Sequence, residues 1–156
     1  MAIHDNHSRT IPSAEFRFAR ADGLQVASAR WDSRCQVRGV VQIAHGMGEH
    51  IGRYAKLVEA LVSAGVTVYG NDHRGHGRTA PSPMQLGDFG AGGFDLLMED
   101  MIRLSQIARK ENPDQPFILV GHSMGSFAAQ QYVLEHSRDV DGLILSGSGA
   151  LDKSRL

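Results

Sequence analysis

The sequence has one cysteine, no excess of either charge and no long apolar run, and each of these shortages excludes a class of protein. Cys35 has no second cysteine to pair with, so an internal disulfide is excluded and a reducing compartment is favoured. The 16 Lys and Arg residues balance 17 Asp and Glu residues, leaving no net field to attract nucleic acid or an acidic membrane surface. We therefore expect no nucleic-acid partner.

Membrane segments and cofactor fingerprints are missing as well. No apolar run approaches the roughly 20 residues that a transmembrane helix needs, and residues 1–13 are polar, unlike a signal peptide. No Gly-x-Gly-x-x-Gly lies at the first strand-to-helix turn, which excludes a dinucleotide-binding domain. We expect a cytoplasmic protein without a cofactor or a transmembrane segment, with a flexible N-terminus at 1–13 and one domain from residue 14 to residue 156.

The first part of the chain has the pattern of a β-hairpin. Residues 13–20 and 24–31 each alternate apolar and polar side chains, and a turn at 21–23 separates them. Such alternation is typical of a strand with one face in solvent. We expect an antiparallel hairpin with one wet face.

The rest of the chain alternates buried strands with helices. Apolar runs typical of strands covered on both faces occur at 37–44, 66–70, 116–121 and 141–146. Helical spacing of apolar residues occurs at 54–65, 97–110 and 124–136, and a Pro- and Gly-rich surface loop is expected at 80–93. Short alternating elements of this kind predict an α/β fold with a mostly parallel sheet behind the N-terminal antiparallel hairpin.

One serine stands at the junction of a predicted strand and a predicted helix. Ser123 is flanked by Gly121 and Gly125, the spacing of a nucleophile elbow, in which side chains at the two glycine positions would collide with neighbouring backbone. The tight turn exposes the serine hydroxyl above the sheet. We expect Ser123 to be a catalytic nucleophile, whereas the motif without its strand and helix would indicate a simple glycine-rich turn.

A serine that attacks a carbonyl needs two backbone N–H donors for the oxyanion that develops. Met124, the residue after the serine, is expected to supply one donor. The other is expected from Met47, in the glycine-containing loop that follows the strand at 37–44. A plain turn is the alternative for this loop taken alone.

Three stretches together resemble the serine α/β-hydrolases of the monoglyceride lipase and lysophospholipase group. They are HGMGEH at 45–50, DHRGHG at 72–77 and GHSMG at 121–125, in the order and with the spacing of that group. The resemblance covers the chain from Phe16 onward. It implies an α/β-hydrolase fold and an ester hydrolase that acts on an acylglycerol, a lysophospholipid or a similar carboxylic ester through an acyl-enzyme on Ser123.

The resemblance also implies a structural role for residues 72–79. His73 and His76 have no carboxylate or cysteine at a convincing metal-ligand spacing, so we expect no metal site. A thioesterase, an amidase or a peptidase of the same fold stays open, because the elbow does not distinguish leaving groups.

The sequence departs from the family's pattern at the catalytic triad. In this fold the triad residues follow the chain order serine, acid, histidine. The family's acid, histidine and lid would follow residue 156, so we expect the N-terminal half of a hydrolase domain, truncated after the sixth strand. His45 and His122 are expected to be structural, and Asp152 is a minor candidate for the acid. The apolar strand edge at 143–146 would be completed by a second chain or a C-terminal piece. The alternative is a non-catalytic hydrolase fragment, or a module that binds a lipid or another hydrophobic ligand, lacking the triad base.

Overall fold

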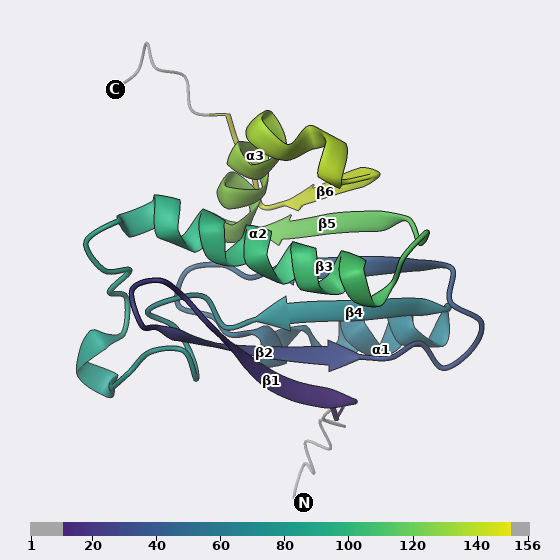
Figure 1. Cartoon of the computed structure of the whole chain (residues 1–156), viewed down its shortest axis with the longest axis horizontal. Coiled ribbons are helices and arrows are strands. Elements are labelled where there is room, and N and C mark those ends of the chain that lie inside the picture. The colour runs from purple at the N-terminus through teal and green to yellow at the C-terminus, as the bar shows by residue number, and fades with distance from the viewer. Residues whose placement is uncertain (1–10, 151–156) are drawn as a thin grey trace, which may run out of the picture.

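Six strands form one sheet in the order β1-β2-β4-β3-β5-β6 in the computed structural model, which describes residues 11–150 (Figure 1). The strands are β1 (Ala14–Ala19), β2 (Gln25–Trp31), β3 (Gly39–Ala44), β4 (Val66–Asn71), β5 (Phe117–His122) and β6 (Gly142–Ser146). β1 and β2 pair antiparallel, β2 pairs antiparallel with β4, and the other neighbouring strands are parallel. The sheet is therefore mostly parallel with an antiparallel hairpin at one edge, as predicted.

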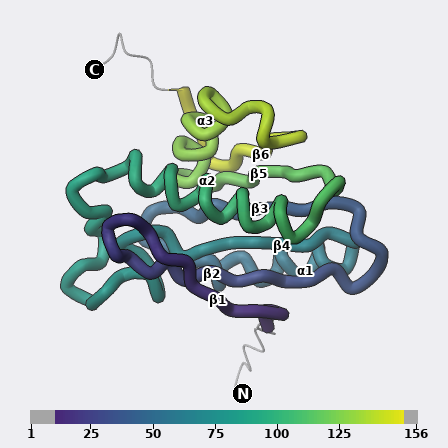
Figure 2. Tube along the Cα trace, in the orientation of Figure 1, coloured from purple at the N-terminus to yellow at the C-terminus, as the bar shows by residue number. Residues whose placement is uncertain are grey.

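Helices cover both faces of this sheet (Figure 2). α1 (Ala55–Ser63) lies behind the sheet in this view, while α2 (Gly93–Glu111) crosses its front and α3 (Met124–His136) follows β5. Three single-turn 3-10 helices complete the described elements: η1 (Ile51–Tyr54), η2 (Pro83–Gln85) and η3 (Ser137–Asp139). A parallel strand pair requires such crossovers, which explains why strands and helices alternate along the chain.

β3 shows how the sheet is buried on both faces. Val41 and Ile43 pack in the cluster that contains the buried side chains of α1. Because successive side chains of a strand point to opposite faces, Val40 and Ala44 pack on the other side, in the clusters that contain residues of α2. Gln42 is fully buried on that side and donates to the Met101 carbonyl at 3.0 Å. The continuous apolar pattern correctly predicted a strand covered on both faces.

The prediction that one face of the hairpin is exposed to solvent is wrong for β2. β1 alternates as expected, but residues 26–29 of β2 are all buried. β2 lies between β1 and β4, and the loop after β4 covers its end, where the Ala27 N–H donates to Thr79 Oγ1 at 2.8 Å. The polar side chain of Ser28 is therefore buried where the alternation predicted solvent.

The remaining segments follow the predictions with shifted boundaries. α2 begins at Gly93, earlier than the helical stripe suggested, and the predicted surface loop before it contains the single turn of η2. β6 is the exception: the prediction of a strand covered on both faces is wrong, because β6 lies at the edge of the described sheet and none of its residues is buried, with Ile144 and Leu145 exposed. In the part of the chain that the structure describes, no helix is both long and apolar enough to cross a bilayer. Most of the predicted flexible N-terminus, up to residue 10, lies outside the described residues.

Candidate active site

Ser123 forms the turn between β5 and α3 in a strained backbone conformation. Its φ of 49° and ψ of −119° are values that residues other than glycine rarely adopt, and such strain costs about 1–3 kcal/mol. Strain of this kind persists only where the surroundings hold it. The Ser123 N–H donates to the Ser146 carbonyl at 2.9 Å, and the Ser123 carbonyl accepts the Ser126 hydroxyl at 2.6 Å. The turn is thus tied to the end of β6 and to the first turn of α3.

Two glycines allow this turn to pack against the neighbouring backbone. A Cβ on Gly121 would lie 2.5 Å from the Gly125 carbonyl oxygen. A Cβ on Gly125 would lie 2.2 Å from the Ala44 carbonyl oxygen, at the end of β3. Real Cβ atoms do not come this close to backbone, so neither position accepts a side chain. The two glycine positions noted in the sequence are therefore those at which β5, α3 and β3 meet.

The loop after β3 touches Ser123 through Gly46. A Cβ on Gly46 would lie 3.2 Å from Ser123 Cβ, which is closer than most Cβ contacts. Glycine, which has no Cβ, fits this position without crowding Ser123. The Gly46 carbonyl accepts the Glu49 N–H at 3.3 Å, closing a four-residue turn. Gly48, the third residue of that turn, has a φ of 69°, as a type II turn requires. The turn carries Met47 at its second position, next to the residue that contacts Ser123.

Two backbone amides at this site have no acceptor among the described residues. Within residues 11–150, neither the Met47 N–H nor the Met124 N–H donates a hydrogen bond, whereas the Gly46 N–H donates to Glu49 Oε2 at 2.9 Å. Met124 is the first residue of α3, where N–H groups lack helical partners and the helix dipole is positive. Both amides are therefore free to bind an electronegative atom of a ligand.

His45 and His122 both make contacts that hold the fold. His45 is fully buried; its Nδ1 lies 2.8 Å from the Gly46 carbonyl and its Nε2 accepts the His73 N–H at 2.9 Å. A carbonyl only accepts and an amide only donates, so His45 is neutral with its proton on Nδ1. Burial lowers the pKa of His45 to about 4, consistent with this form. His122 Nδ1 lies 3.2 Å from Ser146 Oγ, toward β6.

The Ser123 hydroxyl has no base among the described histidines. Within residues 11–150, no side chain forms a hydrogen bond with Ser123 Oγ, although the residue is partly exposed. Asp152, the minor candidate for the triad acid, lies outside the described residues. Its position relative to Ser123 stays a prediction.

The loop after β4 is a buried scaffold. Asp72 accepts the Ile51 N–H at Oδ1 and the Arg78 N–H at Oδ2, at 2.9 and 2.8 Å, which ties this loop to the start of η1. Thr79 Oγ1 donates to the Asp72 carbonyl at 2.6 Å. His73 is completely buried, and burial lowers its pKa well below the usual value. His76 is buried as well, and its Nδ1 lies 3.0 Å from the Arg74 carbonyl.

Sequence reasoning missed Glu49, whose carboxylate binds the loop beside Ser123. Glu49 Oε2 accepts both the Gly46 N–H at 2.9 Å and the Tyr54 hydroxyl at 2.7 Å. The available signal was an acidic side chain three residues after Gly46, close enough to reach back across a four-residue turn. Spacing alone does not show that the turn forms.

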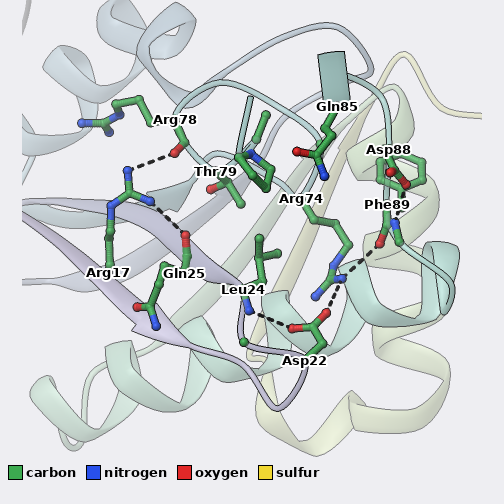
Figure 3. Close-up of a pocket in the computed structure, with 15 residues that line it drawn as sticks. Arg17, Asp22, Leu24, Gln25, Arg74, Arg78, Thr79, Gln85, Asp88 and Phe89 are labelled. Atoms are coloured by element: carbon green, nitrogen blue, oxygen red, sulfur yellow. Dashed lines mark hydrogen bonds and ion pairs between the residues drawn. The ribbon is translucent and has the colours of Figure 1, made fainter. Parts of the chain in front are cut away.

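A pocket of about 670 Å³ lies away from this site, between the turn that joins β1 to β2 and the loop after β4 (Figure 3). Its Arg74 donates to Asp22 Oδ2 and to the Phe89 carbonyl, both at 3.0 Å. Its Arg17 donates to two backbone carbonyls at 3.0 Å. Ser123 does not line it, and these guanidinium groups are already bound within the protein. These features do not indicate that the pocket is the reaction site.

Comparison with known proteins identifies the family of this chain. The family model described as serine aminopeptidase, S33, matches residues 35–155. The monoacylglycerol lipase of Mycolicibacterium smegmatis is 35% identical over 134 residues, covering 86% of this chain and 46% of the relative. The human monoglyceride lipase is 30% identical over 138 residues, covering 88% of this chain and 44% of the relative. The chain thus spans less than half the length of these relatives.

A solved structure extends the comparison to three dimensions. The thermostable carboxyl esterase from Bacillus coagulans, determined in complex with glycerol, superposes with a TM-score of 0.84 at 36% identity, covering 90% of this chain and 46% of the esterase. This similarity confirms the α/β-hydrolase fold predicted from the sequence. The chain belongs to the α/β-hydrolase family described as serine aminopeptidase, S33, and within it is similar to the monoglyceride lipases.

Proposed function

We propose that Ser123 is the nucleophile of a serine ester hydrolase that acts on acylglycerols, lysophospholipids or similar carboxylic esters. One observation carries the proposal: Ser123 occupies a strained turn at the start of α3, and two backbone amides of this site lack acceptors within residues 11–150. Backbone strain at a serine in a tight strand-to-helix turn is expected when the turn exposes the serine hydroxyl to a substrate.

The chemistry that these groups support is acyl transfer. Ser123 Oγ attacks the ester carbonyl carbon and gives its proton to a general base, and the carbonyl oxygen becomes an oxyanion. The N–H groups of Met47 and Met124 would stabilise that oxyanion, and the positive end of the α3 dipole would add to the effect. The carbon–oxygen bond to the alcohol then breaks, the alcohol leaves with the proton, and water hydrolyses the acyl-enzyme.

The base and its carboxylate partner are proposed to come from outside residues 11–150. No described side chain bonds to the Ser123 hydroxyl, and the triad order of this fold puts the acid and the histidine after the nucleophile. The exposed Ile144 and Leu145 on edge strand β6 support pairing with a further strand, from a C-terminal piece or a second chain. A cytoplasmic location fits the single, unpaired Cys35.

The names of the relatives favour esters over amides. The family description names an aminopeptidase, but the two relatives that we compare are named as lipases of monoacylglycerol or monoglyceride, and the solved neighbour is a carboxyl esterase bound to glycerol. The non-catalytic alternative, which rests on the lack of a base within residues 11–150, is less favoured because these relatives are named as lipases.

Labelling with a fluorophosphonate, read by intact mass, tests the proposal. The polypeptide that carries this sequence should gain one adduct, which Ser123→Ala removes and Ser137→Ala, at an exposed serine after α3, retains. The labelled form should lose hydrolysis of a monoacylglycerol, and an aminoacyl anilide should be a poor substrate. Labelling that persists in Ser123→Ala, or faster cleavage of the anilide, would contradict the proposal.

A further inference from the structure

The carboxylate of Glu49 connects the loop after β3 with η1. Its Oε2 accepts the Gly46 N–H at 2.9 Å and the hydroxyl of Tyr54, the last residue of η1, at 2.7 Å. The side chain is only 18% exposed. Burial opposes ionisation, but the hydrogen bonds from Tyr54 and Gly46 and the nearby charge of Arg53, 3.8 Å from Oε1, together outweigh it, so the pKa of Glu49 lies below its usual value. Glu49 is therefore a carboxylate that only accepts hydrogen bonds.

Glu49 holds Gly46 at both of its peptide groups. The side chain binds the Gly46 N–H, and the Glu49 N–H returns to the Gly46 carbonyl at 3.3 Å. A Cβ on Gly46 would lie 3.1 Å from Glu49 Oε2 and 3.2 Å from Ser123 Cβ, so Gly46 is packed between the carboxylate and the serine. The Gly46 carbonyl and the Met47 N–H belong to one planar peptide group, so the contacts that hold Gly46 also set the direction of the Met47 N–H.

The Gly46 and Met47 amides of this loop differ in whether they are available to a ligand. The Gly46 N–H is used by Glu49 and is unavailable to a ligand, whereas the Met47 N–H has no acceptor in the described chain. If Gly46 were released, its peptide could rotate and the Met47 N–H would turn with it. An oxyanion donor is effective only when its direction is set before the reaction.

We propose that Glu49, supported by Tyr54, is a positioning residue that keeps the Met47 amide aimed at the oxyanion formed on Ser123. The proposal rests on the function proposed above and adds a residue to it. Glu49 acts through the backbone of Gly46 and does not itself transfer a proton, because its Oε2 already accepts two hydrogen bonds.

Ester hydrolysis by Glu49→Ala, Glu49→Gln and Tyr54→Phe tests this role in the polypeptide that carries the sequence. Glu49→Ala should lower kcat by about 10- to 100-fold with KM within about 3-fold, because an oxyanion donor acts mainly on the transition state. Glu49→Gln keeps a carbonyl oxygen that can accept both hydrogen bonds and should retain most of the activity. Tyr54→Phe, which removes one support, should be intermediate. Glu135→Ala removes an exposed carboxylate on α3 and should behave as wild type.

Amide hydrogen exchange of the peptide that covers residues 45–50 provides a readout independent of activity. Exchange should accelerate in Glu49→Ala and stay near wild type in Glu49→Gln. Wild-type kcat or unchanged exchange in Glu49→Ala would overturn the proposal. A loss in Glu49→Gln equal to that in Glu49→Ala would also overturn it, by assigning the effect to charge. Failure of Ser123 to take up a fluorophosphonate would instead refute the proposed function, while the exchange data would still report whether Glu49 holds the loop.

Discussion

His45 Nε2 accepts the backbone N–H of His73 at 2.9 Å, which joins the loop after β3 to the loop after β4. The two rings lie 4.2 Å apart between centroids, and both are buried. A protonated His45 could not accept this hydrogen bond. The shape of the loop beside Ser123 thus depends on a histidine that stays neutral in the folded state.

Acid should destabilise the protein through this histidine. Burial lowers the pKa of His45 from 6.5 to about 4, so as pH falls the unfolded chain binds the proton first. The stabilisation is complete above about pH 6.5 and is lost between pH 6.5 and pH 4, by about 3 kcal/mol for His45, and His73 acts in the same direction. Urea unfolding at pH 7.5 and 4.5 measures the effect, which should be smaller in His45→Gln. Equal pH dependence in both proteins would contradict it.

Replacing Met47 by proline should remove an oxyanion donor without opening its turn. Met47 is the second residue of the turn closed between Gly46 and Glu49, a position that favours proline in type I and type II turns, and its N–H has no acceptor in the described chain. Met47→Pro should lower kcat by about 100- to 1000-fold with little change in KM. Met47→Ala, which keeps the N–H, is the matched control. Similar kcat values for the two variants would remove Met47 from the proposed mechanism.

A methyl group at Gly125 should prevent β5 and α3 from packing on β3. Its Cβ would lie 2.2 Å from the Ala44 carbonyl oxygen, a contact that requires backbone movement. We expect Gly125→Ala to lower the free energy of unfolding by about 3 kcal/mol or more in urea titrations. Gly149→Ala, at a glycine with no atom near its Cβ position, should change stability little. Equal stabilities for the two variants would show that the turn is looser than described.

The buried ion pair between Arg74 and Asp100 should matter far more than an exposed one. Arg74 binds both carboxylate oxygens of Asp100, at 2.8 and 3.0 Å, and the Asp100 side chain is fully buried on α2. Asp100→Ala leaves a buried guanidinium without its main partner and should cost about 3–5 kcal/mol in urea unfolding. Arg34→Ala breaks the exposed pair between Arg34 and Glu59 and should cost about 1 kcal/mol or less. A small loss in Asp100→Ala would indicate that water enters the site.

The elements with strong local patterns could be predicted from the sequence. The apolar run of β5, the helical pattern of α3 and the two glycines beside Ser123 are local signals, and the structure forms the predicted turn there. The pattern failed at β2, because alternation reports which side chains are polar and does not report that a distant loop binds the Ala27 N–H or that Ser28 is buried. The residues that bury a strand come from other parts of the chain, so the pattern within the strand does not reveal them.

The sequence by itself determined the α/β order of elements and the position of Ser123 at a strand-to-helix turn. The glycine spacing around Ser123 is a local motif and is visible without a structure, although only the fold shows that Gly125 packs against Ala44 of β3. Only the tertiary structure decided that Gly46 contacts Ser123, that Glu49 occupies the Gly46 amide, and that His45 is locked in one neutral form. The Gly46–Ser123 contact and the His45–His73 hydrogen bond join loops that follow different strands, and they form only when the parallel sheet brings the carboxyl ends of its strands together. The Glu49–Gly46 hydrogen bond forms only when the chain closes the turn after β3.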